Sequence, residues 1–103
     1  MLSDGTEHLR SAVRFPLALP VQLVAGEKLY QAVTDNISAN GVLLRLSELL
    51  MPGTTVDFLI EIPEGVIAPN ESAAVHCSGR VVRSYGIPSR TYAAAVIDEY
   101  SFQ

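Results

Sequence analysis

The stretch Thr34-Asp35-Asn36-Ile37-Ser38-Ala39-Asn40-Gly41 lies where one predicted strand ends and the next begins. Asn36 and Ser38 are two positions apart, so on an extended backbone both side chains leave from the same face. Gly41 stands where a tight turn needs a positive φ, or where another group approaches the backbone closely. An amide, a hydroxyl and backbone N–H groups therefore gather in one patch, and its ordinary interpretation is a polar hairpin turn.

Alternating apolar and polar residues before this stretch predict two antiparallel strands. They are expected over about 17–24 and 28–37, with a hairpin turn at Gly26-Glu27 between them. On the second strand, a side-chain period of two puts Thr34 and Asn36 on one face.

The same pattern continues after the stretch. Further strands are expected over residues 42–46, 56–62, 72–84 and 90–97. We expect a bulge at Gly79, one helical turn over 47–51 and a segment over 98–103 that caps the end of the sheet. Short strands without a helical period predict an all-β fold, a closed or nearly closed antiparallel barrel, because closure removes exposed sheet edges.

The composition narrows the class of protein. A chain of 103 residues of which 49% are apolar is expected to form one domain around one core. The net charge of −4 argues against binding to DNA or RNA polymers, which needs a broad basic surface. Cys77 is the only cysteine, which fits a reducing compartment. Residues 1–8 are polar and lack a signal-peptide apolar region, so a cytoplasmic location is expected. No apolar run approaches the roughly 20 residues of a membrane span, so no membrane insertion is expected.

The sequence gives no support to an enzyme. It holds no nucleophile beside a base, no phosphate-binding glycine loop and no metal-ligand spacing. His8 and His76 are far apart, and Cys77 is expected to be a small core residue. We therefore expect no catalytic residue, no metal and no cofactor.

An arginine pair precedes the first strand. Arg10 and Arg14 are four positions apart with only Glu7 as a nearby acid, so they form a positive arm on an acidic protein. Each guanidinium offers a planar fork of donors and a flat face that can stack on a base. The pair alone is a weak signal, for which a solvated pair is the ordinary interpretation. Followed by the pattern [D/N]xSxxG over residues 36–41, it is much more specific.

These two motifs together resemble those of the PilZ domain family, which binds the bacterial second messenger cyclic di-GMP. Arg10 and Arg14 match the family's arginine pair, and Asn36, Ser38 and Gly41 match its second motif. Segments that resemble family strands are 41–46, 79–83 and 92–102. The resemblance implies a single domain over the whole chain: a six-stranded antiparallel barrel over 15–103, with an arm over 1–14 lying across its outer surface.

The resemblance also implies a ligand site between the arm and the turn. Arg10 and Arg14 would bind phosphate and the guanine O6 and N7 acceptors, and stack on the purine faces. Asn36 and Ser38 would bind a guanine edge or phosphate, and Gly41 would let the backbone approach the ligand. Further candidate contacts are Leu9, Asp35, Asn40, Arg80 and Arg83.

Two departures from the family pattern bear on this hypothesis. Leu9 stands where many relatives have a further arginine. Because leucine cannot stack on a second, intercalated ligand as arginine can, one cyclic di-GMP per site is expected. The chain also ends at Gln103, where many relatives continue into a C-terminal helix.

Two other functions compete with ligand binding. Some PilZ-like domains have lost the ligand and act only as adaptors through protein–protein contacts, but here both motifs are intact. A small barrel for single-stranded nucleic acid would need stacking aromatic residues and a basic groove. An aromatic content of 7% and an acidic net charge do not supply them. The expected partners are therefore cyclic di-GMP and an unidentified effector protein, without nucleic acid.

Overall fold

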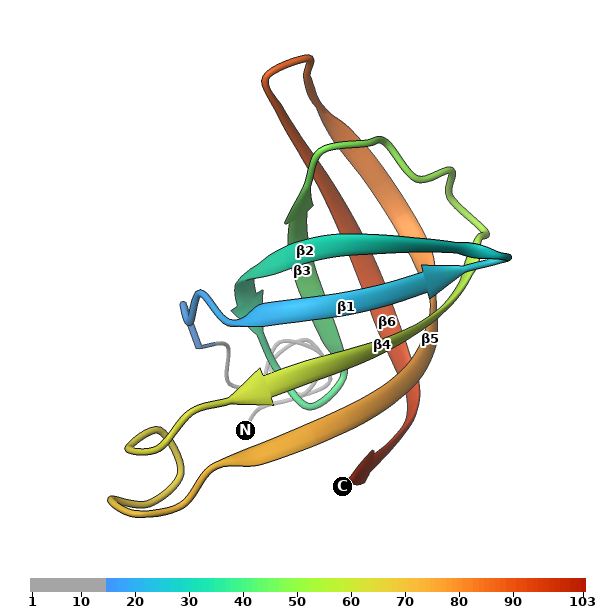
Figure 1. The fold of residues 1–103 in the computed structure, drawn as a ribbon. Helices are drawn as coiled ribbons and strands as arrows, with labels where there is room; N and C mark the ends of the chain where they lie inside the picture. Colours follow the sequence, from blue (N-terminus) through green and yellow to red (C-terminus); the bar gives the residue numbers. More distant parts are fainter. Residues whose placement is uncertain (1–14) are drawn as a thin grey trace, which may run out of the picture.

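Six strands form a closed antiparallel barrel in the computed structural model, which describes residues 15–103 (Figure 1). The strands are β1 (Pro20–Ala25), β2 (Lys28–Ile37), β3 (Gly41–Leu46), β4 (Thr55–Ile62), β5 (Ala73–Ile87) and β6 (Arg90–Phe102). Their order around the barrel is β1-β2-β3-β6-β5-β4, and β4 pairs with β1 to close it. The predicted six-stranded barrel is confirmed.

The core lies inside the barrel and takes every second residue of the strands. On β4, Val56, Phe58 and Ile60 are buried while Asp57 and Glu61 are exposed, as the alternation predicts. The other strands add Val21, Leu23, Val42, Leu44, Cys77, Val81, Ala93 and Ala95. Burial raises the pKa of the Cys77 thiol to about 11. Cys77 is thus a core residue, as expected.

Thr34 is a buried polar residue that ties the entry segment to the barrel. Its hydroxyl donates to the Leu17 carbonyl and accepts a 2.8 Å bond from the Leu19 N–H. These bonds leave Leu17 and Leu19 outside the first strand, which begins at Pro20 rather than near residue 17 as predicted. Proline lacks an N–H for the ladder, so the first position of a strand suits it.

The hairpin of β5 and β6 is the longest in the fold and projects beyond the barrel (Figure 1). The register of β5 and β6 shifts at Gly79, where a bulge was predicted, but the extra residue lies on β6: Ser78 pairs with Glu99 and Gly79 with Ile97, which leaves Asp98 unpaired. A Cβ at Gly79 would lie 1.9 Å from the Val96 carbonyl oxygen, so only glycine allows the two strands to approach this closely. Residues 98–102, which their own pattern placed beyond the last strand, continue β6, as the resemblance over 92–102 implied.

The segment after β3 is irregular rather than helical, so the prediction of a helical turn over 47–51 was wrong. Its polar groups bond to β5 instead. The Leu50 carbonyl accepts a bond from the Ser84 hydroxyl, and the Gly53 N–H donates to the Val81 carbonyl at 2.7 Å. Leu50 is buried against the core.

Candidate functional site

The turn between β2 and β3 is closed by Ser38. Its N–H donates to the Gly41 carbonyl at 2.9 Å, and its hydroxyl donates to the same oxygen at 3.3 Å. The hydroxyl also accepts a 3.3 Å bond from the Asn40 N–H. Such local side-chain bonds to the backbone are the usual way in which serine stabilises a turn. Ser38 is buried, and its first role is to hold this turn.

Gly41 lies at a close approach between two strands. Its φ is not in the left-handed region. A Cβ at this position would lie 3.0 Å from the Ala95 carbonyl oxygen on β6. Of the two reasons expected for this glycine, close backbone approach is the one observed, and the approaching group is the neighbouring strand.

A bulge in β2 places Asn36 on the outer face of the barrel. Thr34 pairs with Leu44 and Asn36 pairs with Leu43, so Asp35 is an extra residue in β2. Directly opposed residues share a face. Thr34 therefore faces the core with Leu44, whereas Asn36 faces outward with Leu43. The prediction that Thr34 and Asn36 share a face was wrong, because the bulge reverses the alternation between them.

Asn36 carries an unusual polar atom. Its Oδ1 is buried and has no hydrogen-bond partner among residues 15–103. Leaving a buried acceptor unpaired costs roughly 1–3 kcal/mol. The atom can accept an N–H bond from a ligand or from an arginine, so Asn36 is the residue of this turn that is best suited to recognise a hydrogen-bond donor.

Strand register brings two of the predicted arginines to the same outer face. Asn36 is linked through Leu43 and Ala94 to Arg83 by successive cross-strand pairs. In the next row, Gly41 pairs with Val96, which pairs with Arg80. At about 4.8 Å per strand, Arg83 lies roughly 14 Å from Asn36 and Arg80 roughly 10 Å from Gly41 along the sheet.

The two arginines differ in their electrostatic environment. Arg80 has Asp98 as a neighbour, with 4.0 Å between Nη2 and Oδ1. Arg83 is exposed and makes no ion pair within the described part of the chain. Between these arginines and the turn, the outer face is formed by Leu43, Ala94 and Val96, all half-buried. The result is an apolar floor, suited to a flat ring, with positive charge at one edge.

The predicted contacts Leu9, Arg10 and Arg14 lie outside the described residues. The structure does show where their segment joins the barrel. Phe15 and Ile37 exchange two backbone hydrogen bonds of 2.8 and 3.0 Å, next to Asn36 and Ser38 in the sequence. Asp35 and Asn40, the other two candidate contacts, are exposed in the bulge and in the turn.

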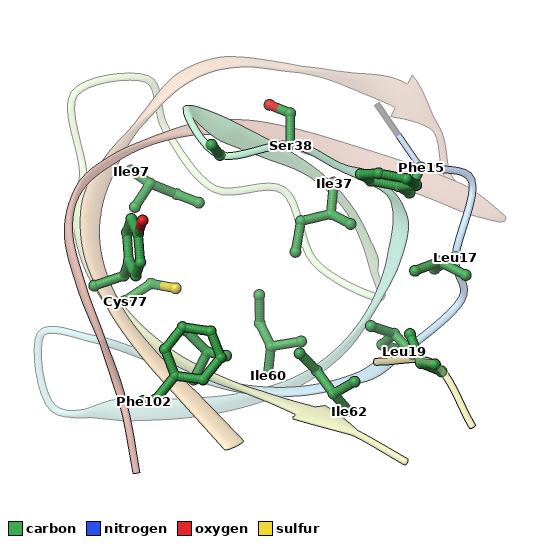
Figure 2. A pocket seen from close by; sticks show the side chains of 14 residues that line it. Phe15, Leu17, Leu19, Ile37, Ser38, Ile60, Ile62, Cys77, Ile97 and Phe102 are labelled. Atoms are coloured by element: carbon green, nitrogen blue, oxygen red, sulfur yellow. The ribbon is translucent and has the colours of Figure 1, made fainter. Parts of the chain in front are cut away.

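The sequence did not predict an apolar mouth at one end of the barrel. Side chains from the entry segment and from β2, β4, β5 and β6 surround a cavity of about 280 Å³ (Figure 2). Alternation indicates which residues face inward, but it does not indicate which end of a barrel stays uncovered. The exposed rim residues Phe15 and Phe102 were the available signal, since both are large and apolar and lie at the ends of the predicted barrel.

Other kinds of site are not visible in residues 15–103. No group of three His, Cys, Asp or Glu side chains in this part of the chain is placed to hold a metal ion. Nor does the described part contain a helix long and apolar enough to cross a membrane.

Comparisons with known proteins agree with this fold. A family model of the PilZ domain matches residues 8–102. Among solved structures, the chain is similar to the inhibitor of motility MotI/DgrA of Bacillus subtilis, with a TM-score of 0.75 and 21% identity. The match covers 89% of this chain and 44% of that protein, so the chain spans less than half of its length. A comparison with curated proteins found no match.

Proposed function

This chain belongs to the PilZ domain family, and on that premise we propose that it binds cyclic di-GMP on the outer face of β2, β3 and β6. The observation that carries the proposal is the unpaired acceptor of Asn36 in the motif turn. Guanine presents an amino donor on a different edge from its O6 and N7 acceptors. Asn36 would accept from the donor edge of one guanine, and its buried Oδ1 would gain the partner that it lacks.

The arginine pair would supply the charge. Arg10 and Arg14 belong to the segment that joins β2 at the bridge between Phe15 and Ile37, so a ligand bound against the turn is within their reach. Guanidinium groups bind phosphate by charge-assisted bonds and match guanine O6 and N7 bidentately. The flat faces of both arginines would cover the purines, while Leu43 would support a ring from below.

Ser38 and Gly41 contribute mainly through the shape of the turn in this proposal. The Ser38 hydroxyl donates to the Gly41 carbonyl and accepts from the Asn40 N–H, so it would hold the backbone of the turn in the shape that the ligand meets. Gly41 lets β3 lie close to β6 and thereby fixes the row that leads to Arg80.

The expected affinity is micromolar. Hydrogen bonds to charged groups contribute roughly 1.5–3 kcal/mol each, and stacking adds about 1–3 kcal/mol per base. Immobilising the arginine side chains and the ligand on binding costs on the order of 2–5 kcal/mol. The remainder corresponds to about 8 kcal/mol. This leaves little excess, so losing one arginine is expected to abolish measurable binding at micromolar ligand.

Calorimetric titration with cyclic di-GMP, and with GTP as the control ligand, tests the proposal. We expect saturable micromolar binding of one ligand per chain, no heat with GTP and no binding by Arg14→Ala. Arg90→Ala is the matched control, because Arg90 is exposed near the tip of the β5–β6 hairpin, and it should bind normally. Near-normal affinity in Arg14→Ala would contradict the assigned roles, and a stoichiometry of two would contradict the reasoning from Leu9.

The signal would pass to an effector protein, without catalysis, cofactor or nucleic acid. A cytoplasmic location follows from a ligand that serves as an intracellular messenger. A ligand-independent adaptor is the second candidate, and exposed apolar residues on the projecting hairpin favour it. Val82, Tyr85 and Ile87 are 50%, 43% and 63% exposed. A titration without heat, and without a shift in melting temperature, would favour the adaptor.

A further inference from the structure

The mouth of the barrel is an apolar feature of the described surface that the proposed function does not use. In Figure 2, Leu17, Ile37, Ile60 and Cys77 point into the opening. Aromatic residues stand at its rim, where Phe15, Tyr100 and Phe102 are 51%, 56% and 63% exposed. An apolar opening with large exposed side chains at its rim is suited to the docking of another apolar group.

The N-terminal segment enters the fold at this rim. Phe15 lines the mouth and is held to Ile37, another lining residue, by two backbone hydrogen bonds. The residues of segment 1–14 are therefore tethered to the edge of the opening. A short tether gives an attached group an effective concentration in the millimolar range. A free partner or a second copy of the chain lacks this advantage.

The sequence of the segment separates apolar from charged side chains. Leu9 and Val13 are four positions apart, as are Arg10 and Arg14. Residues four apart share a face of a helix, and residues an even number apart share a face of a strand. In either conformation Leu9 and Val13 lie together, and the two arginines lie together on a different face.

The segment is also short enough to keep this apolar face near the opening. From Phe15 back to Leu9, the chain spans about 9 Å as a helix and about 20 Å when extended. In the extended case Val13 continues the alternation of Phe15 and Leu17, which both line the mouth. The face of the segment that carries Arg14 would then point away from the opening.

We propose that the N-terminal segment docks on the apolar mouth of the barrel through Leu9 and Val13. The docked segment holds Arg10 and Arg14 outside the opening, beside the turn that carries Asn36. The occupant of the mouth is thus part of the chain itself. The docking does not depend on cyclic di-GMP, and only its effect on ligand affinity rests on the proposed function.

Methyl-resolved NMR of the full chain without ligand tests the docking. We expect nuclear Overhauser effects from the Leu9 and Val13 methyl groups to those of Ile60 and Ile97, which line the mouth. A sample mixed from labelled and unlabelled chains separates contacts within a chain from contacts between chains. Absence of these effects, or their presence only between chains, would overturn the proposal.

Two variants with the same change in net charge provide the comparison. Leu9→Asp with Val13→Asp should shift the Ile60 and Ile97 methyl signals and remove the contacts. Arg10→Gln with Arg14→Gln also lowers the net charge by two, yet should keep them. Loss of the contacts in both variants would show a charge effect and overturn the docking.

The ligand titration separates this inference from the proposed function. The Arg10→Gln, Arg14→Gln variant should keep the docking contacts and bind no cyclic di-GMP. The Leu9→Asp, Val13→Asp variant keeps both arginines and should bind about tenfold more weakly, because the arm is no longer pre-organised. Unchanged affinity in that variant would overturn the positioning role. Docking contacts without any ligand binding by the wild-type chain would refute the proposed function alone.

Discussion

Replacing Asn36 with leucine separates the stability of the barrel from recognition of its ligand. Leucine is close to asparagine in size and has no acceptor to leave unpaired. In the free protein, Asn36 Oδ1 is buried without a hydrogen-bond partner among the described residues. Asn36→Leu should therefore stabilise the free protein and abolish its binding of cyclic di-GMP.

The size of the gain follows from the cost of an unpaired buried acceptor, roughly 1–3 kcal/mol. Leucine would also extend the apolar contact with Leu43, which lies opposite on β3. Because Asn36 is only half-buried, we expect the lower part of the range, about 1 kcal/mol. For a domain of this size, that corresponds to a rise in Tm of about 4–8 °C.

Urea unfolding and calorimetric titration of the same samples measure the two effects. Asn40→Leu is the matched control, because Asn40 is exposed in the same turn, and it should not raise stability. Lower stability in Asn36→Leu than in wild type would refute the reasoning, since it would mean that Asn36 Oδ1 is satisfied in the free protein. Retained binding by Asn36→Leu would refute its role as the recognising acceptor.

Three further predictions follow from the contacts of the outer face and the core. Gly41→Ala should lose about 1–2 kcal/mol in urea unfolding, because its Cβ would meet the Ala95 carbonyl oxygen at 3.0 Å; unchanged stability would mean that the strands adjust freely. Arg83→Ala should weaken cyclic di-GMP binding more than Arg80→Ala in calorimetry at low salt, because the charge of Arg80 is already partly balanced by Asp98 at 4.0 Å. A larger loss of affinity in Arg80→Ala than in Arg83→Ala would mean that Arg83 is not part of the site. The free energy of unfolding should fall between about pH 9 and pH 11, because burial raises the pKa of the Cys77 thiol to about 11 and the unfolded chain therefore loses that proton first. Urea unfolding at pH 8 and pH 10 should show a smaller fall for Cys77→Ala than for the wild-type chain, and an equal fall in both would exclude the thiol as the cause.

The strands were predictable wherever one face is buried and the other is exposed to solvent. The run from Val56 to Ile62 shows this, because each alternation in the sequence becomes an alternation in burial on β4. Residues 47–51 lack such a pattern, and their conformation depends on partners far away in the chain. The Leu50 carbonyl bonds to Ser84, 34 positions later. A contact this distant in the chain cannot be inferred from the local sequence that decides helix formation.

The candidate site was predicted as a set of residues but not as a geometry. A period of two places Thr34 and Asn36 together, and only the pairing with β3 reveals the extra residue Asp35. The reason for Gly41 likewise lies on β6, in a strand that begins nearly fifty positions later. Bulges and close approaches are properties of strand pairs, so a single sequence gives their residue types without their cause.

The bulge at Asp35 connects the two surfaces on which the proposals rest. After the extra residue, Asn36 faces outward with Leu43, and Ile37 faces the inside with Val42. The end of β2 therefore presents an acceptor to the outer face and an apolar side chain to the mouth. The N-terminal segment joins at this same point, through the bridge from Phe15 to Ile37. The docked segment proposed above would present Arg10 and Arg14 to the outer face and Leu9 and Val13 to the mouth, so ligand binding and docking of the arm are expected to reinforce each other.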